Sequence, residues 1–360
     1  MAKYLFRADA SINIGSGHIM RCITLANALH HCGHDIHFIC RDLPGHLGSI
    51  LEKNKIEYSL LGVPNNVGDN IQEITYTHSS WLTVSQRIDF LQSESIIEHY
   101  QPDWIVVDHY ALSIIWQKYA RKYSSKICVI DDLADREHDA DILIDQSFGR
   151  KTDDYCNLVP STCKVLIGPK YAILRPEFQY WRRISLQRRP QIEKIRYILV
   201  SLGGVDKDNI TEMILSALAN SNSLEKNTYI TVVMGKTAPH LHRVIMRANQ
   251  MPYQTCILYD VDNMAELMAK SDLAIGAAGS TSLERCCLGL PTILVILADN
   301  QKYIANNLRN LGAAIVTEKN EVQIEKHLST LNPEGLFKMS EKSQQLVDGL
   351  GIKKIISNFY

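Results

Sequence analysis

A glycine-bearing turn followed by a histidine is the part of this sequence best suited to chemistry. The motif Gly15-Ser16-Gly17-His18 follows an apolar segment at residues 4–9 and opens a stretch with helical periodicity at residues 18–31. Glycines leave backbone N–H groups accessible, and a helix N-terminus adds the positive end of its dipole. Because that dipole disfavours an imidazolium, we expect a neutral His18 that can accept a proton. The alternative is an ordinary loop histidine, one of 13 in the chain.

A second small-residue segment, residues 276–284, is better equipped to bind a phosphate group. It follows an apolar strand and lies where a helix should begin, so N–H groups, hydroxyls and the helix dipole can meet a pyrophosphate there. A glutamate one turn later can accept a hydrogen bond from a ribose. The alternative is a capping box, with Ser280 or Thr281 as the cap and Glu284 near the third helical position. The candidate ligands are Gly279, Ser280, Thr281, Ser282 and Glu284.

Two further strand ends carry residues that suit a ligand. Gly203 and Gly204 follow the strand expected at residues 197–202, and Asn300 and Gln301 follow another apolar strand. The glycines can equally form a tight turn between a strand and a helix, which is the commoner case. The second pair can reach a sugar, or the aspartate before it can simply cap the next helix.

Three Asp-x-Asp patterns are the strongest candidates for metal ligands, and we interpret them as loop residues. They are not surrounded by other acidic residues, and the nine cysteines include no Cys-x-x-Cys spacing. We therefore expect no metal and no cofactor. The patterns are Asp139/Asp141, Asp206/Asp208 and Asp260/Asp262.

Size and composition indicate a globular protein with two α/β lobes. The chain has 360 residues, of which 46% are hydrophobic and 21% charged, and this length exceeds one ordinary core. A net charge of −1 gives no reason to expect nucleic acid or an anionic membrane as a partner. The longest apolar run, residues 288–298, contains Gly289 and Pro291 and is interpreted as a buried strand. The odd number of cysteines favours reduced thiols in a cytoplasmic protein.

Short apolar runs alternate with helical patterns along the chain, which predicts parallel sheets covered on both faces. In such sheets, ligands gather at the carboxyl ends of the strands. Residues 175–194 are interpreted as the crossover between lobes, and helices at 321–330 and 333–348 are expected to pack back across the first lobe. The expected domains are residues 1–190, a lobe that carries the base, residues 191–340, a lobe that binds the nucleotide, and residues 341–360, a helical segment that packs back toward the first lobe. Strands are expected at residues 4–9, 35–41, 56–61, 102–110, 126–132, 141–146, 197–202, 229–234, 256–259, 272–276, 292–297 and 313–316.

An ordered set of motifs spans nearly the whole chain. It resembles the family of UDP-2,4-diacetamido-2,4,6-trideoxy-β-L-altropyranose hydrolases, which act in the pathway to pseudaminic acid. The ordered set is far more specific than any one motif. It consists of Phe6-Arg7-Ala8-Asp9, Gly15 through Cys22, Val107-Asp108-His109-Tyr110, residues 130–136, Asp145-Gln146, residues 168–178, Ser201 through Asp206, Gly279 through Cys286 and Asp299-Asn300-Gln301.

The resemblance implies a glycosyltransferase-B fold, in which two Rossmann-like lobes face a shared cleft that holds the active site. It implies a UDP-sugar substrate bound mainly by the C-terminal lobe, and inverting, metal-independent hydrolysis with His18 as the base. Residues 280–282 would bind the pyrophosphate and Glu284 the ribose, while Tyr110 and Asn300 would face the sugar. The full set of implied substrate-binding residues is Gly15, Gly17, Arg21, Tyr110, Gly203, Gly204, Gly279, Ser280, Thr281, Ser282, Glu284, Asn300 and Gln301.

Two other functions fit the same residues. A glycosyltransferase of this fold would pass the sugar to a lipid or glycan, and it would be expected to expose an apolar patch for a lipid carrier. The polar stretch at residues 62–80 gives no sign of one. A non-catalytic sensor would bind the UDP-sugar tightly and release no UDP. The sequence leaves the number of subunits open.

Overall fold

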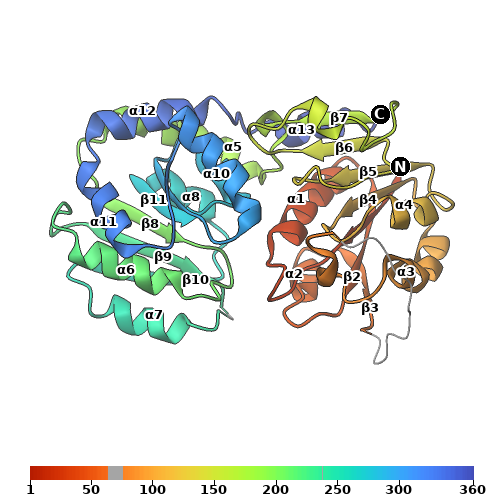
Figure 1. The fold of residues 1–360 in the computed structure, drawn as a ribbon, viewed down its shortest axis with the longest axis horizontal. Helices are drawn as coiled ribbons and strands as arrows, with labels where there is room; N and C mark the ends of the chain where they lie inside the picture. Colours follow the sequence, from red (N-terminus) through yellow and green to blue (C-terminus); the bar gives the residue numbers. More distant parts are fainter. Residues whose placement is uncertain (64–75, 237) are drawn as a thin grey trace. The chain divides into compact units, whose positions relative to one another are not determined.

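The computed structural model describes residues 1–63, 76–236 and 238–360, and the chain folds into two compact units (Figure 1). The first unit contains residues 1–173 and 352–360, and the second contains residues 174–351. Each unit is built around its own parallel β-sheet.

The sheet of the first unit has seven parallel strands in the order β3-β2-β1-β4-β5-β6-β7. The order reverses between β1 and β4, which pair in a register that places Ala8 beside Asp108. Sheets of this kind bind ligands at the carboxyl ends of the strands where the order reverses. The strands are β1 (Lys3–Ala8), β2 (Asp35–Arg41), β3 (Glu57–Leu61), β4 (Trp104–Asp108), β5 (Lys126–Ile130), β6 (Ile142–Asp145) and β7 (Lys164–Ile167).

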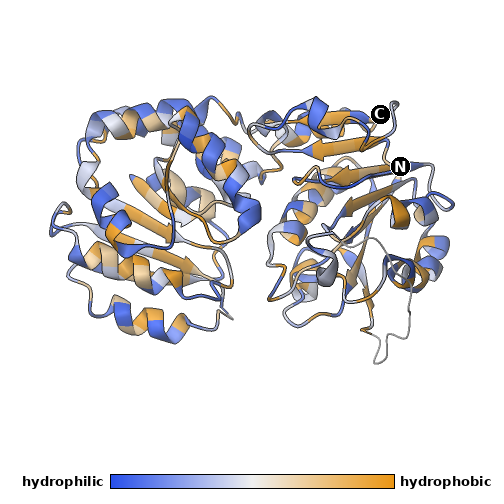
Figure 2. Cartoon of the chain, in the orientation of Figure 1, coloured by the Kyte–Doolittle hydropathy of each residue, from blue (hydrophilic) through white to orange (hydrophobic). Residues whose placement is uncertain are grey.

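Side chains at alternate strand positions fill two cores, one on each face of this sheet. Phe6 and Val106 pack with α1 on one face, and Leu5 and Ile105 pack with α3 and α4 on the other. Figure 2 shows the strands as mainly apolar and the helices as mixed, which is the pattern of a sheet buried on both faces. The helices are α1 (Gly17–His31), α2 (Gly48–Lys53), α3 (Gln86–Tyr100), α4 (Ile114–Ala120) and α13 (Gly351–Ile356).

The last residues of the chain complete the core of the first unit. Ile355 and Phe359 are buried there. The Phe359 ring meets Trp104 edge-on, with ring centroids 4.7 Å apart, and meets Tyr4 in the same way at 5.4 Å. The first unit is therefore formed from both ends of the sequence.

The second unit repeats the design with six parallel strands in the order β10-β9-β8-β11-β12-β13. Here the order reverses between β8 and β11, whose register places Ser201 beside Gly276. The strands are β8 (Tyr197–Ser201), β9 (Tyr229–Met234), β10 (Gln254–Tyr259), β11 (Leu273–Ala277), β12 (Thr292–Val295) and β13 (Ile315–Thr317). The helices are α5 (Pro176–Arg188), α6 (Ile210–Asn220), α7 (Leu241–Ala248), α8 (Met264–Lys270), α9 (Thr281–Cys287), α10 (Lys302–Leu311), α11 (Glu321–Thr330) and α12 (Pro333–Gln344).

The predicted strands are confirmed, each with ends within two residues of the expected ones, while β7, α2 and α4 were not predicted. The expectation that the helices at 321–330 and 333–348 pack across the first lobe is wrong. They are α11 and α12, and their apolar residues Ile324, Leu328 and Leu336 join the core of the second unit. Within the described residues, no helix is long and apolar enough to cross a membrane.

The segment interpreted as a crossover contains helix α5, which the structure groups with the second unit, whereas the sequence placed the boundary at residue 190. Hydrogen bonds explain this grouping. Arg182 Nη2 donates to the carbonyl of Gln344 at 2.9 Å, and the Ser185 hydroxyl donates to the carbonyl of Leu288 at 2.7 Å. The polar side chains of α5 thus bind the backbone of its own unit.

Candidate functional site

The turn before α1 lies at the carboxyl end of β1, beside the end of β4. Ser11 shapes this turn. Its hydroxyl accepts the N–H groups of Asn13 at 3.2 Å and Ile14 at 3.0 Å, and its carbonyl accepts that of Gly15 at 2.8 Å. Gly15 has a φ of +81°, where a residue with a side chain would be strained. The turn therefore brings His18 to the point where the strand order reverses.

His18 contacts a buried carboxylate that the sequence analysis did not single out. Its Nδ1 lies 2.6 Å from Oδ1 of Asp108, and Arg21 donates to both oxygens of that carboxylate, at 2.6 and 2.7 Å. Burial alone would raise the pKa of Asp108, but the Arg21 guanidinium, with His18, holds it well below its usual value. An ionised Asp108 only accepts hydrogen bonds, so a neutral His18 carries its proton on Nδ1 and presents the lone pair of Nε2. Gly17, by contrast, is exposed at the start of α1.

Arg21 and Tyr110, two of the residues predicted to contact substrate, are joined by Asp132. Arg21 Nη1 forms an ion pair with Asp132, and the Tyr110 hydroxyl donates to the same carboxylate oxygen at 2.9 Å. Both side chains are buried, and the Tyr110 ring meets His18 edge-on with centroids 4.5 Å apart. Through Arg21 and the Tyr110 ring, Asp132 thus helps to position both members of the His18–Asp108 pair. Direct contact of Arg21 or Tyr110 with a substrate stays a prediction.

An aromatic group that the sequence analysis missed packs against Tyr110. Trp81 stacks on Tyr110 with centroids 5.6 Å apart, and the His78 ring lies 4.4 Å from that of Trp81 and 5.4 Å from that of Tyr110. Both residues are half-buried, and burial lowers the pKa of His78, which is therefore neutral at pH 7. His78 belongs to the polar stretch at 62–80, of which residues 64–75 lie outside the described part of the chain, and Trp81 follows directly after that stretch.

A fully buried network of charges lies next to the turn. Asp89 accepts hydrogen bonds from Arg7 at 2.6 and 3.0 Å, from Arg41 at 2.6 Å and from the Trp116 indole at 2.9 Å. Arg7 also donates to Asp9, the residue that follows β1. Two arginines and two aspartates balance their charges, as a buried network requires. Because it joins β1, β2, α3 and α4, the network fixes the base of the turn that carries His18.

In the second unit, predicted ligands lie at the ends of β8 and β11, where that sheet also reverses its order. Gly203 and Gly279 both have open space where a Cβ would stand. The backbone of Gly204 packs closely on Gly235, which donates to its carbonyl at 3.0 Å. A Cβ on Gly235 would lie only 2.1 Å from that oxygen. Bare backbone thus lines the ends of the two central strands, as close approach by a phosphate requires.

The residues that open α9 divide into exposed and internal groups. Ser280 is exposed and Thr281 half-buried, whereas Ser282 is buried and accepts a hydrogen bond from Arg285 at 3.3 Å. No side-chain hydrogen bond caps α9, so the capping-box alternative is wrong. Glu284 is half-buried, and burial raises the pKa of its carboxyl group. Contact of this carboxyl group with a ribose hydroxyl stays a prediction.

Asn300 and Gln301 lie in a short 3-10 helix, Asp299–Gln301, that follows β12. Gln301 is engaged internally, because its side-chain oxygen accepts the N–H of Leu297 at 3.0 Å. Asn300 is exposed. Of the pair, Asn300 is thus the residue with a side chain open to a ligand.

Four of the six aspartates considered as metal ligands, those of the first two pairs, have other partners. Asp139 and Asp141 both pair with Arg121, at 3.0 and 2.6 Å. The carboxylate of Asp206 accepts N–H groups at the start of α6, and Asp208 pairs with a lysine. Among the described residues, no group of three or more His, Cys, Asp or Glu side chains could hold a metal ion.

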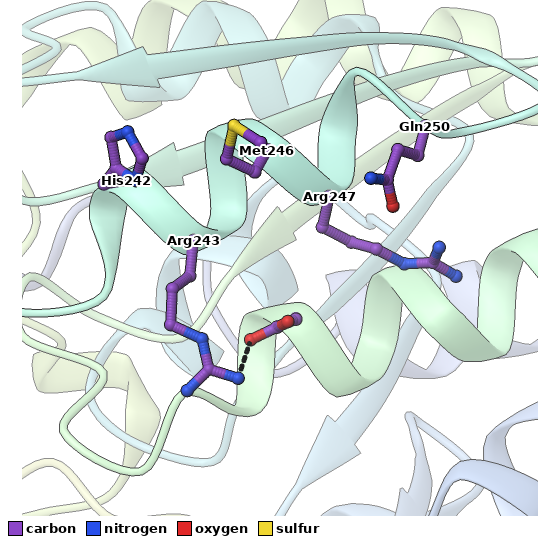
Figure 3. A pocket seen from close by; sticks show the side chains of 6 residues that line it. His242, Arg243, Met246, Arg247 and Gln250 are labelled. Carbon is purple, nitrogen blue, oxygen red and sulfur yellow. Dashed lines mark ion pairs between the residues drawn. The ribbon is translucent and has the colours of Figure 1, made fainter.

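A surface hollow of about 200 Å³ lies on α7 of the second unit (Figure 3). Arg243 pairs there with Glu212 of α6 at 2.9 Å. Helices line this hollow, not the carboxyl ends of strands, so it forms no part of the predicted sites. Its other lining residues are His242, Met246, Arg247 and Gln250.

Sequence comparisons relate the chain to two nucleotide-sugar enzymes. It is 26% identical over 313 residues to the UDP-2,4-diacetamido-2,4,6-trideoxy-beta-L-altropyranose hydrolase of Campylobacter jejuni, a match that covers 86% of this chain and 97% of that protein. A shorter match, 36% identical over 118 residues, is to the UDP-N-acetylglucosamine–N-acetylmuramyl-(pentapeptide) pyrophosphoryl-undecaprenol N-acetylglucosamine transferase of Clostridioides difficile. It covers 30% of this chain and 26% of that protein.

The structure is similar to the crystal structure of MurG from Acinetobacter baumannii. The TM-score is 0.70 at 16% sequence identity, and the match covers 99% of both chains. Together with the two parallel sheets, this similarity confirms the glycosyltransferase-B fold. Residues 197–358, in the C-terminal half of the chain, match the model of the glycosyltransferase family 28 C-terminal domain.

Proposed function

We propose that this protein hydrolyses UDP-2,4-diacetamido-2,4,6-trideoxy-β-L-altropyranose to UDP and the free sugar. The observation that carries this proposal is the pairing of His18 with Asp108 at the carboxyl end of β1, which orients an imidazole as a base. The similarity to the Campylobacter jejuni hydrolase extends over most of both chains and suggests the substrate.

In this mechanism, His18 Nε2 takes a proton from a water molecule as the water oxygen attacks the anomeric carbon. The bond between that carbon and the UDP oxygen breaks, its electron pair leaves with UDP, and the sugar inverts. Asp108 stabilises the imidazolium that forms, and Arg21 keeps Asp108 ionised and in place.

Hydrolysis in ¹⁸O-labelled water tests this proposal. We expect UDP to be released, the label to appear on the anomeric hydroxyl, and proton NMR to show the inverted anomer first. Label in UDP would instead indicate attack on phosphorus. Tight binding of the UDP-sugar without any release of UDP would indicate a sensor, and either result contradicts the proposal.

A glycosyltransferase is the second candidate, favoured by the match of residues 197–358 to family 28. Both reactions release UDP from the same UDP-sugar, but a transferase needs an acceptor other than water. UDP release that remains slow in buffer and rises strongly when a lipid-linked or glycan acceptor is added would favour the transferase.

Replacing Glu284 with glutamine is expected to weaken UDP binding roughly 10- to 150-fold. The NH2 group of glutamine cannot accept the hydrogen bond that a carboxylate oxygen would accept from a ribose hydroxyl, and hydrogen bonds to charged groups contribute about 1.5–3 kcal/mol. Isothermal titration with UDP measures the change. Glu266→Gln is the matched control, because that glutamate is bound to Lys270 on α8 and should leave UDP affinity unchanged. Equal UDP affinities for the two variants would show that Glu284 does not bind the nucleotide.

A further inference from the structure

A tyrosine hydroxyl lies between two buried carboxyl groups beside the candidate site. Tyr155, in the 3-10 helix Thr152–Tyr155, has its oxygen 2.8 Å from Oδ2 of Asp131 and 2.9 Å from Oδ2 of Asp145. All three side chains are buried. Asp131 follows β5 and Asp145 ends β6, and these strands are neighbours, so the sheet fixes the two carboxyl groups close together.

This group has too few protons if both carboxyl groups are ionised. A phenol has one proton and a carboxylate has none, so only one of the two contacts could then be a hydrogen bond. The other would set a carboxylate oxygen against a phenol lone pair. Burial and the two carboxyl groups hold the pKa of Tyr155 well above its usual value, so the phenol keeps its proton. One of the two aspartates must therefore carry a second proton.

Asp131 is the ionised partner. Its Oδ2 accepts the N–H groups of Leu133 at 3.2 Å and Ala134 at 2.8 Å, and the Arg136 guanidinium lies 2.9 Å from its Oδ1. Burial alone would raise the pKa of Asp131, but Arg136 and the other donors lower it to about 2. The Tyr155 proton therefore points to Asp131.

Asp145 is in a less favourable environment for a charge. It accepts the N–H of Ser147 at 2.8 Å and Arg150 Nε at 3.1 Å. Burial, and then repulsion by Asp132, raise its pKa to about 7. The charged or titratable groups around it are Asp131 and Asp132 after β5, and Arg150, Asp154 and Tyr155 from the connection after β6.

The local charge balance points the same way. Four carboxyl groups that are buried or less than a fifth exposed lie on this side of the first sheet with only three guanidinium groups, which leaves one negative charge in excess. Asp135 and Asp154, which pair with Arg136 and Arg150, are about a third exposed and are not counted. A proton on one carboxyl group removes that excess. The carboxyl groups are those of Asp108, Asp131, Asp132 and Asp145, and the guanidinium groups are those of Arg21, Arg136 and Arg150.

We propose that Asp145 is a neutral carboxylic acid that donates its proton to the Tyr155 hydroxyl, and that this relay positions the turn formed by Asp131 and Asp132. Tyr155 holds the Asp131 side chain, while Arg150 Nη2 donates to the carbonyl of Asp132 at 2.9 Å. Asp132 in turn anchors the side chains that pack beside the candidate base. Asp145 and Tyr155 are thus positioning residues, not groups that touch substrate.

Two isosteric variants test the protonation state in the full chain, through melting temperatures measured from pH 5 to pH 8.5. Folded Asp145 keeps its proton, whereas the unfolded chain loses it above about pH 4, so this group makes wild-type stability fall as the pH rises from about 4 to about 7. The Asp145→Asn variant keeps a donor toward Tyr155 but has no titrating group at this position. The melting temperature of the variant relative to that of wild type should therefore rise with pH up to about pH 7. Asp131→Asn, the matched control, should melt lower at every pH.

A melting temperature for Asp145→Asn that is lowered as much as that of Asp131→Asn, by an amount independent of pH, would overturn the proposal. Carbon-13 NMR of aspartate-labelled wild type asks the same question without any variant. A carboxyl resonance that titrates near pH 7 supports the neutral acid. Completion of all aspartate titrations below about pH 5 refutes it.

The positioning role rests on the proposed function, since its readout is turnover. Tyr155→Phe and Asp145→Ala should each lower kcat roughly tenfold or more at unchanged UDP affinity, because small displacements of catalytic groups are costly. Asp145→Asn should restore kcat and flatten its pH profile. Wild-type kcat in Tyr155→Phe would refute the positioning role. A wild type that releases no UDP would count against the proposed function alone, because melting and NMR need no substrate.

Discussion

Replacing His18 with alanine is expected to lower kcat for UDP release by about 10²- to 10⁴-fold, the usual contribution of a general base. The expected loss is large because the imidazole is held by Asp108 on its Nδ1 and by a perpendicular contact with the Tyr110 ring. UDP affinity should not change, since the predicted nucleotide ligands belong to the second unit. Steady-state UDP release and calorimetric titration with UDP measure the two quantities.

His31→Ala is the matched control for this experiment. His31 lies in the last turn of the same helix, α1, and is exposed, so its removal should leave both kcat and UDP affinity unchanged. If His18→Ala kept kcat within about tenfold of wild type, the barrier would have changed by only about 1.4 kcal/mol. His18 would then not be the base.

Replacing Asp89 with asparagine is expected to destabilise the first unit by about 3–5 kcal/mol, the usual effect of breaking a buried ion network. The change leaves Arg7 with Asp9 as its remaining carboxylate partner, and it leaves the buried Arg41 guanidinium with the carbonyl of Gly62. Urea unfolding followed by tryptophan fluorescence measures it, because three of the four tryptophans belong to that unit.

Asp42→Asn provides the comparison for Asp89→Asn, because the Asp42 side chain is 60% exposed and should contribute little. Equal urea midpoints of unfolding for the two variants would show that the buried network adds no stability.

The pH dependence of the stability difference between wild type and Asp89→Asn gives a second check. Burial alone would raise the pKa of Asp89, but Arg7 lowers it below the unfolded value of about 3.9. Its contribution is therefore present above that value and lost on acidification below it, so the gap between wild type and variant should narrow in acid.

The strands could be predicted because their apolar runs are long and end in polar or glycine residues. The elements that were missed have weaker signals. β7 has only four residues, two of them half-buried and one exposed, and α2 is a single short helix. The segment that contains helix α5 was interpreted as a crossover because it is rich in arginine, glutamine and glutamate and contains two prolines. Its arginine partners lie far along the chain, as Gln344 does from Arg182, and local periodicity carries no information about them.

His18 could be proposed from its place after a strand and a glycine turn, but its partner could not. Asp108 lies 90 residues away, and it meets His18 because β4 pairs with β1 in one particular register. Polar residues at the ends of these strands were a usable signal, since parallel strands end at a common edge. Arg21 is a similar case. The family resemblance implies that Arg21 contacts the substrate, which stays a prediction, but it gave no sign that Arg21 donates to Asp108 and Asp132.

The return of residues 352–360 to the first unit has a consequence for biosynthesis. Phe359 packs on Trp104 and Tyr4, so the ribosome must finish the entire second unit before the first can close its core. At about 5–20 residues per second, the nascent first unit waits on the order of ten seconds or more with that apolar surface uncovered. A chain cut short near its end would present the same surface permanently, which would give quality-control proteases a way to recognise incomplete copies.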